Sequence, residues 1–160
     1  MQDNDVLAVL RASTPRRVIG VLALGSLGVL LLYLALVQPP AMGWQLVMVA
    51  LGALVIWLAE RMWRATARTL ELTREGLRSD DGVMIARIAD LASVERGVFA
   101  FKPSNGFSIR LKSKAPAAWQ PGLWWRVGRR IGVGGVTASA NAKVMAEIME
   151  DQMNRQSPKP

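Results

Sequence analysis

The chain lacks the two side chains that most often carry acid–base and nucleophilic chemistry. Its 160 residues include no histidine and no cysteine. Histidine is the usual general base and metal ligand near neutral pH, and cysteine supplies disulfides and thiolate sites. The serine and threonine hydroxyls therefore have no imidazole to act as their base. The composition excludes a Ser-His hydrolase, a disulfide-stabilised domain and a thiolate zinc site.

Carboxylates are the remaining candidates for catalysis or for binding a divalent cation. Asp80 and Asp81 are adjacent, but a glycine follows them, and Asp-Asp-Gly is typical of a turn. The spacing of an EF-hand loop is absent, and no second acidic cluster is evident. Glu60 stands beside Arg61 and Arg64, which favours a solvated or arginine-paired carboxylate. We therefore expect no enzymatic activity, no metal, no cofactor and no small-molecule substrate.

One glycine-rich segment invites a phosphate-binding interpretation. Residues 132–135, GVGG, precede a stretch with a helical pattern, and helix N-termini can bind phosphates. Neither the G-x-G-x-x-G spacing nor the Gly-Lys-Ser/Thr ending of a P-loop is present. We interpret the segment as a turn between the last strand and the last helix.

Positive charge is the most informative chemical feature. The formal net charge is +8, although hydrophobic residues make up 51% of the chain. An apolar and basic chain suggests an anionic membrane surface or a nucleic acid as its partner. No known basic-aromatic nucleic-acid motif is present, so we expect anionic phospholipid headgroups and no nucleic acid. Basic side chains spread around a solvated sheet are the alternative. No acidic residue lies between Glu95 and Glu147, an interval that contains Arg96, Lys102, Arg110, Lys112, Lys114, Arg126, Arg129, Arg130 and Lys143.

Two apolar runs predict the elements that position these charges. Residues 18–37 carry no charge and are long enough to cross a bilayer core as a helix, and residues 43–62 form a second span whose uncharged part, 43–59, is shorter. Paired prolines at 39–40 prevent one continuous helix. Two buried helices of a soluble protein, or a cleaved signal peptide for the first run, are the alternatives. Neither run has a polar face, and no clear cleavage site follows the first. The sequence predicts a transmembrane helical hairpin over residues 18–63.

Residues at the ends of the spans predict how the hairpin is oriented. Trp44 and Trp63 lie near the two ends of the second span, as interface anchors do. Arginines flank the hairpin on both sides, whereas the loop between the spans has none, and the positive-inside rule then places both termini in the cytoplasm. These arginines are Arg11, Arg16 and Arg17 before the first span and Arg61, Arg64 and Arg68 after the second.

Beyond residue 68 the pattern changes to the period of two that is typical of strands. An Ala- and Pro-rich stretch at 113–122 is interpreted as a linker, and an amphipathic helix is expected from about residue 139 to 153. Residues 1–17 are assigned to a separate N-terminal segment and residues 154–160 to a disordered tail. Expected strands cover residues 69–73, 77–79, 83–88, 93–102, 107–112, 123–127 and 130–133, with turns at 80–82 and 103–106.

Residues 69–153 resemble bacterial pleckstrin-homology-like (PH-like) domains that are attached to transmembrane helix pairs. The resemblance is carried by residues 70–95 (LELTREGLRSDDGVMIARIADLASVE), residues 106–114 (GFSIRLKSK) and the RRIGVGG segment before the last helix. It includes the T-x-E-G-L end of a first strand and the I-x-D-L-x-x-V stretch at 88–94. It implies an α+β membrane protein in which a transmembrane hairpin is followed by an antiparallel β-sandwich or barrel capped by a C-terminal helix. PH-like domains serve lipid binding, protein docking and scaffolding alike, so no particular ligand is implied.

The segment WQPGLWWRVGRR, residues 119–130, is the best candidate contact site. Strand periodicity places Leu123, Trp125 and Val127 on one face and Trp124 and Arg126 on the other, and one of the two faces is expected to fill the barrel. The sequence leaves open which face is buried. Trp124 and Arg126 are the candidate outward residues, at the membrane interface or against a partner. All candidate contact residues together are Trp44, Trp63, Arg61, Arg64, Trp119, Trp124, Arg126, Arg129 and Arg130.

Two functions are compatible with these features. The first is a non-catalytic accessory, assembly or scaffold subunit of a larger complex in the bacterial inner membrane, which contacts other integral membrane proteins. The second is a membrane-surface sensor module that binds anionic phospholipids.

Overall fold

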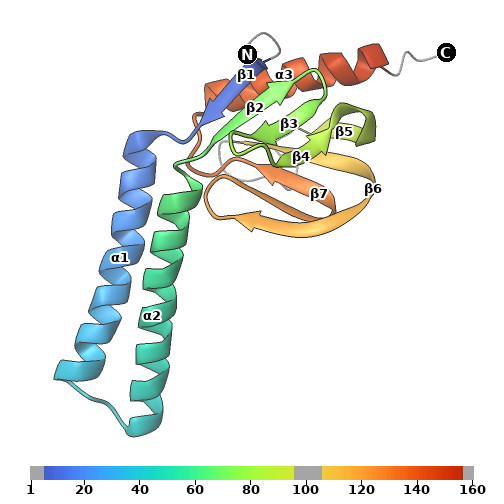
Figure 1. The fold of residues 1–160 in the computed structure, drawn as a ribbon. Coiled ribbons are helices and arrows are strands. Elements are labelled where there is room, and N and C mark those ends of the chain that lie inside the picture. The colour runs from blue at the N-terminus through green and yellow to red at the C-terminus, as the bar shows by residue number, and fades with distance from the viewer. Residues whose placement is uncertain (1–5, 96–105, 157–160) are drawn as a thin grey trace.

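The computed structural model describes residues 6–95 and 106–156 and shows a helical hairpin that projects from a β-sheet domain (Figure 1). Helix α1 (Thr14–Val37) and helix α2 (Met42–Ala65) form the hairpin. Two antiparallel sheets and helix α3 (Ser139–Gln156) form the domain. The chain is therefore of mixed α+β class, with its apolar helices set apart from its sheets.

Helices α1 and α2 are both long and apolar enough to cross a membrane. Each has 24 residues, about 36 Å of helix, and extends beyond the span expected from its apolar run. Only 11% and 17% of their most apolar 18 residues are buried, unlike the core helix of a soluble domain. Glycines allow the two backbones to approach, since a Cβ atom on Gly28 would lie 3.1 Å from the Gly52 carbonyl oxygen.

The four-stranded sheet has the order β1-β2-β3-β4 and contains one strand that the sequence did not predict. Strand β1 lies before the hairpin in the chain, yet it pairs antiparallel with β2, with Leu10 opposite Leu70. It therefore belongs to the folded domain and not to a separate N-terminal segment, and the hairpin is inserted between the first two strands. The turn between β3 and β4 is confirmed, with Gly82 at a φ of 82°. The strands are β1 (Val6–Arg11), β2 (Thr69–Thr73), β3 (Gly76–Ser79) and β4 (Met84–Arg87).

The three-stranded sheet, of order β5-β6-β7, corrects two predictions. The linker predicted at 113–122 is wrong for most of its length, because residues 113–120 are the second half of β6. The two strands predicted at 123–127 and 130–133 are one strand, continuous through Gly128 at a φ of 60°. The turn predicted at 103–106 lies almost wholly outside the described residues, as does most of the strand predicted at 93–102. A short 3-10 helix, η2 (Ile88–Asp90), leads into β5 (Leu91–Glu95), and β6 (Phe107–Gln120) and β7 (Trp124–Val133) follow.

The β6–β7 hairpin turns a sharp corner halfway along its length. Arg110 is opposite Arg130, and the next pair is Ala115 with Gly128. Strand β6 thus advances by five residues where β7 advances by two, because the strand on the outside of a corner follows the longer path. We call residues 107–111 with 130–133 the root of this hairpin, and residues 115–120 with 124–128 its arm.

Both sheets and α3 enclose one hydrophobic core. The arm returns along the root, and the Gly134 amide donates a hydrogen bond to the Leu123 carbonyl oxygen (2.8 Å). Helix α3 closes the core with Met145 and Met149, which are fully buried. It continues to Gln156, so the predicted disordered tail is wrong for residues 154–156, and residues 157–160 lie outside the described part of the chain.

Candidate contact surface at the base of the hairpin

Arginine side chains brace the base of the hairpin, where both helices meet the domain. The Arg17 guanidinium lies over the Trp63 ring, 3.8 Å from its centroid, and donates a hydrogen bond to the Trp63 carbonyl oxygen (2.9 Å). Arg16 donates to the Thr137 carbonyl oxygen, also at 2.9 Å, just before α3. Because α1 is thus tied to α2 and to the domain, the hairpin has a defined direction relative to the sheets.

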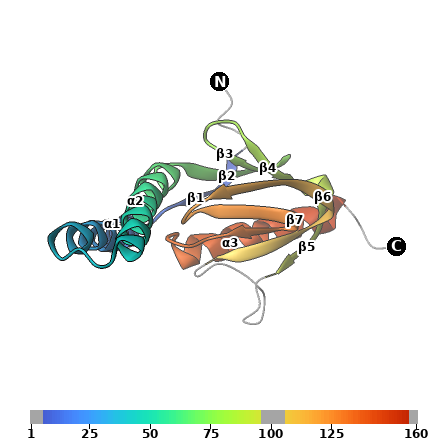
Figure 2. The same cartoon turned by 90° about the horizontal axis from the view of Figure 1, so that it is seen from below.

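The tip of the arm rests on the last turns of α2. A Cβ atom on Gly122, between β6 and β7, would lie 3.0 Å from Cγ2 of Thr66 and 3.2 Å from Cε of Met62. The same methionine packs against α1, where a Cβ atom on Gly20 would lie 2.8 Å from its Cε. Figures 1 and 2 show that β6 and β7 lie on the side of the domain toward which the hairpin projects.

The register of the arm decides which of its tryptophans face the core. Gln120 is opposite Trp124, and Trp119 is opposite Trp125. Trp124 belongs to the hydrophobic core with 5% of its surface exposed, whereas Trp119 is 48% exposed. The prediction that Trp124 points outward is therefore wrong. Trp125 shares the outward face with Trp119, because residues directly opposite each other in a sheet lie on one face.

The outward face of the arm is apolar. Val127 follows Trp125 by two residues, so it lies on the same face, and it is 63% exposed. The sequence left open which face of residues 123–127 is buried, and the structure buries Leu123 and Trp124 but leaves Val127 exposed. The Trp125 indole is half-buried because it crosses Gly132 of the root, where a Cβ atom would lie 2.7 Å from Cζ2. We call Ala117, Trp119, Trp125 and Val127 the apolar stripe.

Arg126 is a structural brace and not an outward contact residue, which corrects a further prediction. Its Nε donates to the Pro116 carbonyl oxygen (2.8 Å), and Nη1 donates to the Ile85 carbonyl oxygen (2.9 Å). Ile85 belongs to β4, the edge strand of the other sheet. The guanidinium also lies 5.9 Å from the centroid of the Trp124 ring. Arg126 therefore links the arm to the four-stranded sheet.

Exposed basic side chains gather at the corner between root and arm. Arg129 and Arg130 are exposed there, in agreement with their predicted outward position, and Arg110 is directly opposite Arg130. Nζ of Lys112 donates to the Ala89 carbonyl oxygen (2.8 Å). Within residues 6–95 and 106–156, no carboxylate forms an ion pair with these side chains. We call Arg110, Lys112, Lys114, Arg129 and Arg130 the basic corner.

The remaining predicted contact residues occupy the two ends of α2. The base of the hairpin, close to the tip of the arm, contains Arg61, Arg64 and Trp63, the last of which is described above. Arg64 pairs with Glu60, which confirms the arginine-paired carboxylate, and the Arg61 guanidinium lies 5.4 Å from the centroid of the Trp57 ring. Trp44 is 68% exposed near the opposite end of the helix. The structure therefore brings all of these residues except Trp44 to the base of the hairpin.

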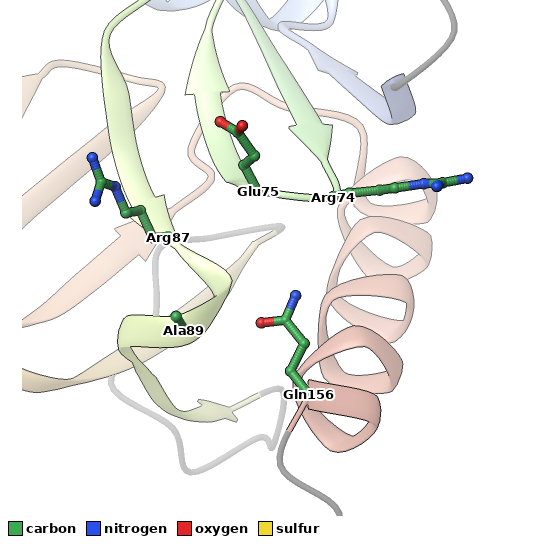
Figure 3. A pocket seen from close by; sticks show the side chains of 5 residues that line it. All are labelled: Arg74, Glu75, Arg87, Ala89 and Gln156. Atoms are coloured by element: carbon green, nitrogen blue, oxygen red, sulfur yellow. The ribbon is translucent and has the colours of Figure 1, made fainter.

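Within residues 6–95 and 106–156, no cluster of three or more His, Cys, Asp or Glu side chains that could hold a metal ion occurs. A groove of about 500 Å³ is lined by Arg74, Glu75, Arg87, Ala89 and Gln156. Figure 3 shows the side chains of Arg74 and Arg87 pointing away from each other on opposite sides of this groove. Two guanidinium groups that point apart in this way cannot bind the same anion.

The correct register of the arm had one signal in the sequence. Pro121 and Gly122 form a typical turn pair, and Gly122 has a φ of 79°. A three-residue turn centred on Gly122 places Gln120 opposite Trp124 and Trp119 opposite Trp125. The linker prediction for residues 113–122 gives no such pairing, because a linker has no strand register.

Comparison with known proteins adds no assignment. No family model matches the chain, and no curated protein or solved structure is significantly similar to it.

Proposed function

We propose that this chain is a non-catalytic integral protein of the bacterial inner (cytoplasmic) membrane, and that it is an accessory, assembly or scaffold subunit of a larger complex. The hairpin spans the bilayer, and the domain and both termini lie in the cytoplasm. The observation that carries the proposal is the insertion of the hairpin between β1 and β2. Because the domain contains strands from before and after the hairpin, it is connected to the hairpin at two points. The orientation of its surfaces beside the membrane is therefore fixed.

The dimensions of α2 support membrane insertion. Trp44 and Trp63 are separated by about 28 Å along the helix axis, close to the roughly 30 Å of a bilayer core. Large apolar side chains are exposed around both helices. Water solvates such a surface poorly, whereas lipid tails or neighbouring helices cover it. The arginines at the base and their absence from the loop support a cytoplasmic domain.

The arrangement of the domain supports a PH-like assignment. A four-stranded and a three-stranded antiparallel sheet enclose one core, and a C-terminal helix closes it. The resemblance noted in residues 70–95 and 106–114 points to the same family. Such a domain carries no inherent chemistry, so the surfaces that it presents decide its role.

A groove on the hairpin supports an integral membrane partner. It has a volume of about 390 Å³ and lies between α1 and α2, with an almost entirely apolar lining that includes Gly25 and Trp63. Gly20 and Gly28 serve the packing of the hairpin, but a Cβ atom on Gly25 would meet nothing within 4 Å. We propose that a helix of the partner complex packs here.

Gentle purification of the full chain from its native membrane tests this function. We expect integral membrane companions in constant ratio, and we expect Gly25→Leu to reduce their recovery at least tenfold by filling the groove. Gly43→Leu is the matched control, since Gly43 also has open space around it but does not line the groove. A lone monomer or homo-oligomer, or equal losses in both variants, contradicts the proposal.

A sensor of anionic phospholipids is the second candidate function, and the basic corner favours it. Five exposed cationic side chains held close together by two strands would respond to the charge density of the inner leaflet. A sensor requires the domain to change state with lipid charge, whereas a scaffold requires only that the companions bind. Hydrogen exchange of the full chain in neutral and in anionic nanodiscs separates the two.

A further inference from the structure

The arm begins at the depth of the proposed membrane interface. Its tip contacts Met62 and Thr66, which lie on either side of the anchor residue Trp63 along α2. Tryptophan at the end of a membrane span occupies the headgroup region. If α2 crosses the membrane as proposed, the tip of the arm lies at that same level.

The outward face of the arm is directed toward the membrane. The arm lies on the side of the domain from which the hairpin projects, and Figure 2, which views that side, shows β6 and β7 in front of the rest of the domain. Trp124 on the inward face belongs to the core. The opposite face, which carries the apolar stripe, therefore points away from the core, in the direction in which α1 and α2 project from the domain.

The composition of this face suits a lipid interface better than water. Trp119 and Val127 expose 48% and 63% of their surfaces, and the side chain of Trp125 lies beside Trp119 on the opposite strand. Exposed aromatic and branched apolar side chains are unfavourable in water but favourable in the interfacial layer, where an indole keeps its N–H hydrated. Trp119 and Val127 are thus the large exposed side chains of the stripe, while the Trp125 indole is half-buried over Gly132.

The charge at the end of the arm complements an anionic surface. Arg110 and Arg130 are directly opposite each other, a like-charge pair that is unfavourable in a sheet without an anion nearby. The other members of the basic corner lie next to this pair. Phosphate groups of acidic lipids supply the missing negative charge, and each basic side chain near such a surface strengthens binding about fivefold.

We infer that the β6–β7 arm is an interfacial membrane anchor. It lies in the headgroup layer of the membrane that the hairpin crosses, with its apolar stripe inserted and its basic corner on anionic phospholipid phosphates. The inference rests on the proposed insertion of the hairpin. The arm is a third attachment of the chain to the membrane, beside the two helices. It therefore fixes the tilt of the domain relative to the surface of the leaflet.

Single labels report the depth of the arm in the full chain. Since the chain has no cysteine, Val127→Cys, Val144→Cys and Leu27→Cys each provide one site for an environment-sensitive fluorophore. Leu27 lies in the middle of α1 and is 47% exposed. Val144 is 51% exposed on α3, which lies on the side of the domain away from the hairpin (Figure 1). The variants are reconstituted in nanodiscs of mixed phosphatidylcholine and phosphatidylglycerol, with lipids that carry a quencher at the headgroup or in the tail.

We expect headgroup quenching and a blue shift at residue 127, tail quenching at residue 27, and neither at residue 144. If residue 27 is quenched and residue 127 is not, the arm inference fails while membrane insertion stands. If residue 27 is not quenched, the proposed insertion itself fails. Equal quenching at residues 127 and 144 also overturns the inference, because the domain would then touch lipid without a preferred face.

The charge component has its own test. In the labelled Val127→Cys background, Arg129→Gln with Arg130→Gln should lower the equilibrium constant for arm–lipid contact roughly tenfold or more, and high salt should have a similar effect. Arg87→Gln with Lys143→Gln is the control, since it removes the same charge from exposed positions outside the basic corner. Equal responses of the two double variants, or no dependence on lipid charge, overturn the role of the corner.

Discussion

The root and the arm are two halves of the same pair of strands, yet they have opposite relations to the core. In the root, Ile109 is opposite Ile131, both inward and buried, and charged residues occupy the next positions outward. In the arm, the inward face holds Trp124, whereas the outward face carries the apolar stripe. The root has the ordinary pattern of a half-solvated sheet, whereas the arm has its exposed apolar residues on the outward face and combines Trp124 with Arg126 on the inward face.

This difference shows how a single β-hairpin can have two environments. An exposed apolar face beside a buried one is expected where lipid or a partner covers the exposed face. The corner makes this possible, because it redirects the second half of the hairpin toward the base of the helices. One face of the arm remains in the core, and the other faces the direction in which the hairpin projects.

The largest expected effect follows from removing the inward tryptophan of the arm. Trp124→Ala should lower the free energy of unfolding of the full chain by about 3–5 kcal/mol, because it leaves a large cavity in the core. Chemical denaturation in detergent micelles, followed by near-ultraviolet circular dichroism, measures the change. A loss below about 1 kcal/mol would mean that the arm does not share the core of the root.

An intermediate effect is expected from the brace between the arm and the four-stranded sheet. Arg126→Met should cost about 1–3 kcal/mol, because the carbonyl oxygens of Pro116 and Ile85 lose their donor. Hydrogen exchange should accelerate in residues 115–128 and remain slow in the root. Arg129→Met, at an exposed position without these bonds, is the control and should change neither quantity. Uniform acceleration in both halves would contradict a separable arm.

The smallest effect on folding is expected at the outward tryptophan. Trp119→Ala should change the free energy of unfolding in micelles by less than about 0.5 kcal/mol, since the side chain is half exposed. The same substitution at Trp124 is its matched counterpart on the opposite face. A large loss of stability at Trp119 would remove the contrast between the two faces, and with it the physical basis of the apolar stripe.

Much of the fold could be predicted from local pattern. The apolar runs predicted both long helices, the alternation in residues 107–112 predicted the root, and Asp80-Asp81 with the following glycine predicted a turn that the structure contains. In each case the signal lies within one short segment, because helix and strand periodicities are local properties.

The errors concern relations between distant segments. Local pattern does not predict strand β1. Its partner, β2, follows the whole hairpin, so no residue near Leu10 indicates the pairing with Leu70. Residues 113–120 have the composition of a linker, because alanine and proline favour strands weakly. Their pairing with β7 outweighs that preference.

The sequence by itself determined the apolar hairpin, the strand-rich domain, the basic second half and the absence of histidine and cysteine chemistry. Only the tertiary structure decided that the hairpin interrupts the domain, that the β6–β7 hairpin turns a corner, and that Trp124 lies inside while Trp125 and Val127 lie outside. The physical reason is the period of two in a strand. When both faces carry apolar residues, a shift of one residue exchanges the faces without changing the pattern, so the partner strand and the turn must set the register.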